Sequence, residues 1–230
     1  ACLVIQTLAL GMDVYKDIIV SVLDELLQPE MIYERNDASV RTLEGLPLQK
    51  GFLKGQGETM LQVRENGLLF YADIENGQKT GFFYDQRDNR RLLSKFVADA
   101  EVLDCFCFTG SFSIHAAAYG ARHVTGIDIS AAAVEMAKKN AVLNQVQNSC
   151  DFQEANAFDL LREYSDSGRS YDTVILDPPA FTKSKSSVES AARGYKEINL
   201  RGLKMIRPGG YLVTCSCSFH MDRNLFRTVV

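Results

Sequence analysis

The 230-residue sequence lacks the features of several protein classes. It has no run of about 18 apolar residues, which argues against a membrane-spanning helix, and its apolar start lacks the basic flank of a signal peptide. None of its six cysteines forms a Cys-x-x-Cys pair, and its three histidines are scattered. We therefore expect no metal site and no disulfide framework. Reduced thiols in a cytoplasmic protein without a membrane partner are the simplest interpretation.

A basic excess is also missing, since the net charge is −4. A domain that binds RNA by itself usually carries surplus Lys and Arg. Any nucleic-acid partner must therefore be held by a local patch of this chain or by a module that the chain does not contain.

The pattern of residues 1–80 predicts a small α+β domain. A helix is expected over residues 13–27, where apolar residues recur at helical spacing and gather on one side. Strands are expected at 31–34, 61–63 and 68–73, and Glu65-Asn66-Gly67 is a hairpin signal between the last two. The Gly- and Lys-rich stretch 51–58 predicts an exposed loop.

Residues 81–230 alternate strands and helices. Strands are expected at 102–106, 124–127, 151–154, 173–176 and 211–215. Helices are expected at 85–96, 110–119, 131–143, 157–164, 188–206 and from about 222. This alternation predicts an α/β domain with a Rossmann-like parallel sheet. Because the sequence stops within a helix, we expect further C-terminal strands of that sheet to be missing.

One loop, residues 104–110, joins a strand to a helix and predicts a nucleoside site. Asp128 ends the next strand, where a carboxylate can accept hydrogen bonds from both ribose hydroxyls. A dinucleotide site would need three glycines, but this loop has only Gly110. S-adenosylmethionine has no phosphate, so one glycine suffices for it. The alternative is a flavodoxin-like domain that binds no nucleotide.

Further cofactor contacts come from residues near these strand ends. The predicted contacts are Asp104, Phe106, Thr109, Gly110, Asp128, Asn156, Asp177 and Arg87. Asn156 could read the adenine edge, or it could simply cap a helix. Arg87 or Arg90 could hold the methionine carboxylate of the cofactor, or both could belong to a solvated, charged helix start.

Asp177-Pro178-Pro179 closes another apolar strand. The prolines turn the chain away and leave Asp177 at the carboxyl end, where open α/β sheets bind ligands. Enzymes that methylate exocyclic amines usually have an aromatic residue directly after the prolines; here Ala180 stands there and Phe181 follows. Asp177 could instead be a helix cap. The predicted substrate contacts are Pro178, Pro179, Phe181, Lys183 and Arg193, of which the basic pair could also be merely solvated.

Cys217 lies just past the strand 211–215, flanked by Ser216 and Ser218. A thiolate that adds to C6 of cytosine makes C5 nucleophilic toward a methyl sulfonium. Cys217 and Asp177 have the residue types and positions for this chemistry. Cysteine is also one of the most commonly buried residues, and Cys215, further inside the strand, is a core candidate.

Several stretches together resemble the cytosine-C5 methyltransferases of bacterial large-subunit ribosomal RNA. They are residues 80–90, 104–110, 177–181, 193–199 and 216–218, in this order. The resemblance implies a Rossmann-like S-adenosylmethionine domain after a small α/β domain, with ribosomal RNA as partner and an N-terminal PUA domain that this chain lacks. It also implies Cys217 as the nucleophile and Asp128 as the ribose ligand. Asn156 stands where aspartate is usual, and Ala180 where lysine is common.

Three hypotheses follow from these observations. In the first, the protein forms 5-methylcytosine in RNA through Cys217, with Asp177 orienting the base. In the second, the same cofactor methylates another acceptor and Cys217 is inert. In the third, the chain is a non-catalytic binding module. An uncovered apolar sheet edge would favour a homodimer.

Overall fold

The computed structural model describes residues 1–182 and 184–230. It divides into two compact units. Unit 1 comprises Ala1–Val63 and Tyr71–Asp85, and unit 2 comprises Arg64–Phe70 and Gln86–Val230. The division falls within the hairpin formed by β4 (Met60–Glu65) and β5 (Leu68–Asp73), which contains the expected Asn66-Gly67 turn.

Unit 1 is built on a three-stranded sheet of order β1-β2-β3. Its strands are β1 (Cys2–Ile5), β2 (Met31–Asn36) and β3 (Gln49–Lys54). β1 and β2 are parallel, whereas β2 and β3 are antiparallel. The expectation of an exposed loop over 51–58 is therefore wrong for its first half, because Gly51–Lys54 pair with β2. Gly51 and Lys50 both have a low intrinsic propensity for β-strands, and pairing with β2 outweighs it.

The expected helix over 13–27 is divided into α1 (Leu10–Val14) and α2 (Lys16–Leu27). Only part of its apolar side packs on the unit: Ile19 and Leu23 are half-buried, but Ile18 and Val22 are 61% and 47% exposed. The apolar side of this helix is therefore only partly covered by unit 1.

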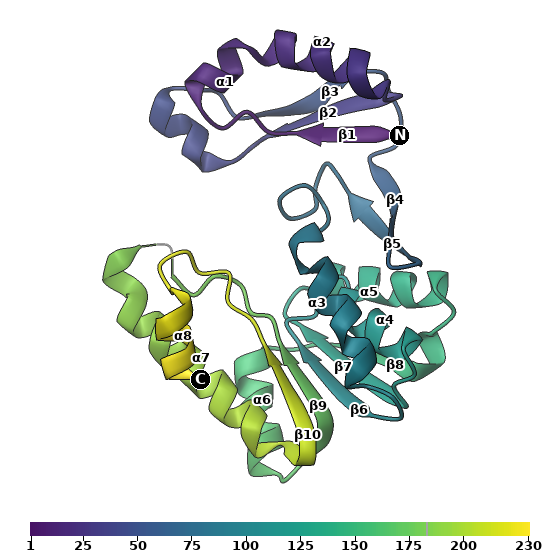
Figure 1. The fold of residues 1–230 in the computed structure, drawn as a ribbon, viewed down its shortest axis with the longest axis vertical. Helices are drawn as coiled ribbons and strands as arrows, with labels where there is room; N and C mark the ends of the chain where they lie inside the picture. Colours follow the sequence, from purple (N-terminus) through teal and green to yellow (C-terminus); the bar gives the residue numbers. More distant parts are fainter. Residues whose placement is uncertain (183) are drawn as a thin grey trace. The chain divides into compact units, whose positions relative to one another are not determined.

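Unit 2 contains a five-stranded sheet of order β10-β9-β6-β7-β8, in which all neighbouring strands are parallel (Figure 1). The strands are β6 (Glu101–Cys105), β7 (His123–Asp128), β8 (Cys150–Glu154), β9 (Tyr171–Leu176) and β10 (Ile206–Thr214). Each expected strand of residues 81–230 is present within two residues of its predicted ends, except that β10 begins at Ile206 rather than at residue 211. The predicted Rossmann-like α/β class is confirmed.

Helices cover both faces of this sheet (Figure 1). They are α3 (Arg87–Leu92), α4 (Ser111–Ala118), α5 (Ala131–Leu143), α6 (Ala157–Asp166), α7 (Val188–Lys204) and α8 (Arg223–Val229). One core cluster joins β6, β7 and β9 to α6 and α7, with Leu103, Ile127, Leu161 and Tyr195 at 0% exposure. Ser130 caps α5 as expected, since its hydroxyl accepts the Ala133 N–H.

The expected helix 85–96 is broken into short pieces, of which α3 is the only α-helical one. Side-chain pairing explains its placement, because Arg90 binds both carboxylate oxygens of Glu65 at 2.6 and 2.9 Å. Both side chains are nearly inaccessible. Periodicity alone does not reveal such a pair between segments 25 residues apart.

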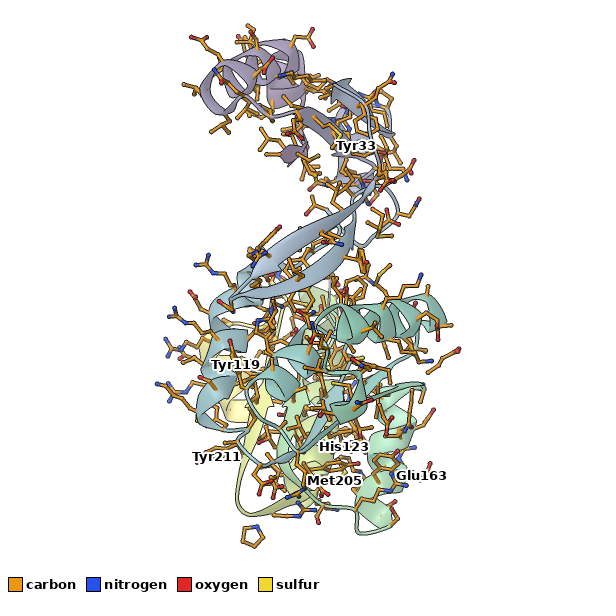
Figure 2. All side chains as sticks on the ribbon, turned by 90° about the vertical axis from the view of Figure 1, so that its right-hand side faces the viewer. Tyr33, Tyr119, His123, Glu163, Met205 and Tyr211 are labelled. Atoms are coloured by element: carbon orange, nitrogen blue, oxygen red, sulfur yellow. The ribbon has the colours of Figure 1, made fainter. Side chains whose placement is uncertain are left out.

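His123 opens β7 and Met205 directly precedes β10 (Figure 2). They mark the amino ends of the parallel strands. Two of the sequence-predicted site residues, Asp104 and Asp128, lie at the opposite, carboxyl ends of β6 and β7. Asp177 and Cys217 lie just beyond the carboxyl ends of β9 and β10. No helix among the described residues is both long and apolar enough to cross a bilayer.

Candidate active site at the carboxyl ends of the strands

The strand order places β6 and β9 side by side in the middle of the sheet. From β6 the chain continues to β7 and β8, which lie on one side of β6. It then crosses to β9 on the other side of β6, and β10 lies beyond β9. Such a reversal is the point at which open α/β sheets bind ligands, beyond the carboxyl ends. Asp104 lies near the end of β6, and Asp177 directly follows β9.

The loop after β6 has an unusual backbone. Phe106, Phe108 and Gly110 all have positive φ, at 65°, 49° and 80°. Two of these three are bulky residues, for which this conformation is strained. A Cβ atom on Gly110 would lie 2.9 Å from Ala137 Cβ and 3.1 Å from the Phe152 ring, so the glycine allows the loop to pack on α5 and β8.

Asp104 is fully buried beneath this loop. Its Oδ2 accepts a 2.6 Å hydrogen bond from Ser113, whereas Oδ1 has no partner among the described residues. Burial, together with a smaller effect of the nearby Asp177 charge, raises the pKa of Asp104 to about 7. The hydroxyl of Thr109 is likewise buried and has no hydrogen-bond partner in the part of the chain that the structure describes. A bound polar group could satisfy these two atoms, one at the end of β6 and one in the loop that follows it.

Asp128 lies at the end of β7 and is half-buried. Its two oxygens accept the backbone N–H groups of Phe108 and Ser130, both at 2.9 Å. Each carboxylate oxygen can accept a second hydrogen bond. The carboxylate is thus held in place by the loop and retains capacity for the two hydroxyls of a ribose.

Asn156 caps α6, because its Oδ1 accepts the Phe158 N–H at 3.0 Å. The side chain is exposed at the same rim. Asn156 therefore does cap the helix. Its side-chain amide can still contact a ligand through the nitrogen or through the second lone pair of Oδ1.

The two candidate arginines differ in their surroundings. Arg90 is buried against Glu65 and is not available to a methionine carboxylate. The Arg87 side chain is 61% exposed and lies 3.7 Å from Asp88. Of the pair, only Arg87 presents an accessible guanidinium.

Cys217 lies against the loop that begins with Asp177. Cys217 is exposed, and its Sγ lies 3.7 Å from the carbonyl oxygen of Pro178, the residue after Asp177. Gln86 donates to Asp177 Oδ1 at 3.1 Å. By contrast, Cys215 is only half-exposed, and burial raises the pKa of its thiol to about 12. The structure thus brings the predicted nucleophile and the predicted base-orienting carboxylate to one rim.

The other predicted substrate residues are dispersed. Pro178 is buried and Pro179 is exposed. Phe181 packs inward against Tyr195, with ring centroids 4.5 Å apart. Arg193 is exposed and paired with Glu189 one helical turn away. Lys183 lies outside the described residues.

Three features of this rim were not expected from the sequence. Gln86 binds Asp177, Tyr195 bonds to both serines beside Cys217, and Phe219 is 91% exposed two residues beyond the thiol. Gln86 and Tyr195 come from distant segments, so no local pattern reveals them. An aromatic residue in a loop directly after Ser-Cys-Ser is a signal that could have identified Phe219.

The sequence profile of S-adenosylmethionine-dependent methyltransferases matches residues 35–226. The chain belongs to this methyltransferase family. Relatives named "Ribosomal RNA large subunit methyltransferase I" are 43% identical in Shewanella amazonensis and 44% identical in Aliivibrio fischeri. Each alignment covers 99% of this chain but only 58% of the relative.

Solved structures of methyltransferases have the same fold. SMU.776, described as a methyltransferase and solved with S-adenosylhomocysteine, superposes with a TM-score of 0.85 at 22% identity, over 100% of this chain and 59% of that one. Trm5b from Pyrococcus abyssi gives a TM-score of 0.65 at 19% identity, over 91% and 56%. Among the described residues of this family member, no cluster of His, Cys, Asp and Glu could hold a metal ion.

Proposed function

We propose that this chain carries the catalytic part of a ribosomal RNA methyltransferase that forms 5-methylcytosine. The observation that carries the proposal is the position of Cys217: an exposed thiol 3.7 Å from the Pro178 carbonyl, beside Asp177. The chain spans 58% of the length of its ribosomal RNA methyltransferase relatives. Their names support ribosomal RNA as the substrate.

The residues present fit S-adenosylmethionine. Asp128 would hold the ribose hydroxyls, Asn156 would contact the adenine, and Arg87 would bind the methionine carboxylate. Asp104 Oδ1 and Thr109 Oγ1, which have no hydrogen-bond partner among the described residues, would bond to polar atoms of the cofactor or to a water molecule bound beside it. When bound, the cofactor supplies an electrophilic methyl group on a sulfonium.

The chain's own residues would then activate the base. Asp177 orients the target cytosine through its N3/N4 edge, and the Cys217 thiolate forms a bond from Sγ to C6. The electron pair displaced from the C5–C6 double bond makes C5 the nucleophile toward the methyl group. Loss of the C5 proton to a base then restores the double bond and expels the Cys217 thiolate.

RNA contacts must be local, because the net charge of the chain is −4. The Phe219 ring, which is 91% exposed, offers a stacking surface beside the thiol. Every base has a π face, so an aromatic ring can hold an unstacked nucleotide without recognising its sequence.

Replacement of Cys217 tests the covalent step. Cys217→Ala is expected to lower the rate of methyl transfer by at least about 1000-fold, whereas S-adenosylhomocysteine should bind with unchanged affinity. The matched control is Cys215→Ala, which removes the neighbouring half-buried thiol and should retain activity. Methylated nucleosides would be identified by mass spectrometry of digested ribosomal RNA.

A second measurement uses RNA that contains 5-fluorocytosine. Fluorine at C5 cannot leave as a proton does, so a covalent complex of protein and RNA should accumulate and map to Cys217. Full activity of Cys217→Ala, or a methylated product other than 5-methylcytidine, would contradict the proposal.

A further inference from the structure

A hydroxyl network surrounds Cys217 in the folded chain. The phenol oxygen of Tyr195 accepts a hydrogen bond from Ser216 Oγ at 2.9 Å and shares another with Ser218 Oγ, also at 2.9 Å. Because these serines immediately flank Cys217, a single phenol is bonded on both sides of the thiol. Tyr195, Ser216 and Ser218 are called the tyrosine–serine clamp below.

The clamp also joins the two loops that form the rim. Ser218 Oγ accepts the backbone N–H groups of Phe181 and Thr182, at 3.0 and 3.4 Å. These residues follow Asp177-Pro178-Pro179 after β9, whereas Ser218 follows β10. The distance between the thiol and the Pro178 carbonyl is therefore set by hydrogen bonds on both loops.

The ring of Tyr195 is held in place by packing against other aromatic rings. It has no exposed surface, and it packs on Phe181 and, edge to face, on Phe226, with ring centroids 4.5 and 5.3 Å away. Gly194 leaves room for Phe181, since a Cβ atom there would lie 3.1 Å from that ring. Tyr195 thus connects a packed helix, α7, to an exposed reactive loop.

We propose that Tyr195 is a positioning residue, which acts through Ser216 and Ser218 to hold the Cys217 thiol beside Asp177 for attack on the base. The inference rests on the proposed covalent function of Cys217. An exposed thiol must be placed within about 3–3.5 Å of C6 in the correct orientation, and a displacement of about 1 Å can cost a factor of 100 in rate. Tyr195 and Ser218, which are both buried, hold the thiol in place without touching the substrate.

Tyr195→Phe tests the clamp because it keeps the ring packing and removes only the hydroxyl. We expect kcat for methyl transfer to fall about 10- to 100-fold, while the KM for S-adenosylmethionine and for RNA changes less than about two-fold. The rate at which Cys217 forms its adduct with 5-fluorocytosine RNA should fall by the same factor as kcat. The Phe181 and Thr182 amides should exchange their hydrogens faster.

Two further variants separate positioning from folding. Ser216→Ala removes one bond of the clamp at a half-exposed site and should lower kcat in the same way, and Ser216→Thr, which keeps a hydroxyl, should restore most of it. Tyr164→Phe is the matched control, because Tyr164 is also buried in the core cluster but is not part of the clamp. Removal of the Tyr164 hydroxyl should leave kcat unchanged.

The outcomes distinguish the clamp from the function on which it rests. If wild-type protein forms the Cys217 adduct and both Tyr195→Phe and Ser216→Ala form it at the wild-type rate, the positioning role is refuted and the covalent function stands. If wild-type protein forms no adduct and Cys217→Ala is fully active, the covalent function itself fails. Equal losses in Tyr164→Phe and Tyr195→Phe would also refute a specific role of the clamp.

Discussion

Asp104 is a fully buried carboxyl group, and among residues 1–182 and 184–230 only one of its two oxygens has a hydrogen-bond partner. Burial raises its pKa from 3.8 to about 7, so the folded protein binds this proton more tightly than the unfolded chain does. The contribution of this bound proton to the free energy of unfolding is therefore fully present below about pH 4, and it is lost as the pH rises to about 7. The total loss is about 4 kcal/mol.

Asp104→Asn should remove this pH dependence, because an amide of the same shape does not ionise. The amount by which the free energy of unfolding of the variant exceeds that of the wild type is expected to be about 3 kcal/mol larger at pH 8 than at pH 5. Urea titrations followed by circular dichroism at both pH values would measure it. Ser113→Ala is the control, since it keeps the carboxylic acid. Its stability should still depend on pH, with the change moved to higher pH because the Ser113 hydrogen bond lowers the pKa of Asp104. A gain of the same size at both pH values would show that Asp104 does not titrate in this range.

Phe219 permits a test of RNA binding that does not depend on catalysis. Phe219→Ala should weaken the binding of a single-stranded RNA about 5- to 150-fold, since stacking on one base contributes about 1–3 kcal/mol. Phe219→Tyr keeps a ring and should bind like the wild type. Fluorescence anisotropy of labelled RNA measures both. Unchanged binding by Phe219→Ala would mean that the ring does not stack on the substrate.

At the scale of elements, the tip of the β4–β5 hairpin is held by charge within unit 2. Glu65 and Arg90 form a bidentate pair whose side chains are 0% and 3% exposed. His115 lies 3.7 Å from the same carboxylate, and burial lowers the pKa of this imidazole, which favours its neutral form. Arg90 is therefore the main counter-charge of Glu65.

Arg90→Met should lower the free energy of unfolding by about 3–5 kcal/mol, because Glu65 is then buried without its cation. The double variant Glu65→Gln/Arg90→Met should recover most of this loss, since it removes both charges. Urea unfolding at pH 7 compares the two with the wild type. If the double variant were as unstable as Arg90→Met, lost packing of the arginine side chain would explain the effect instead of the unpaired charge.

Helices with local signals could be predicted well from the sequence. The helix 131–143 has its predicted ends, because Ser130 supplies a cap and the apolar residues have a regular spacing. β3 and the broken segment 85–96 could not be predicted, because each depends on a partner far away in the sequence: β2 for β3, and Glu65 for Arg90. The site divides in the same way. Asp104, Asp128, Asp177 and Cys217 lie at or just beyond strand ends and are visible in the sequence. Gln86 and Tyr195, by contrast, approach from other elements.

At the scale of the whole molecule, the proposed cofactor residues all belong to unit 2, although the chain forms two compact units. They are supplied by the loops after β6, β7, β8 and β9, together with Arg87 on α3. A ligand that binds only the native state stabilises the elements that it contacts, by about 2.7 kcal/mol at 100 times its Kd. Stabilisation by the cofactor product should therefore be confined to unit 2.

Hydrogen exchange with and without S-adenosylhomocysteine would test this confinement. We expect slower exchange in peptides that contain the loop 104–110, Asp128 and Asn156, since these segments would close around the ligand. Exchange in β1, β2 and β3 should not change. The variant Asp128→Ala, which loses the carboxylate proposed to hold the ribose, should need a higher ligand concentration for the same protection. Equal protection of β1–β3, or full protection of Asp128→Ala at the wild-type concentration, would place the cofactor elsewhere.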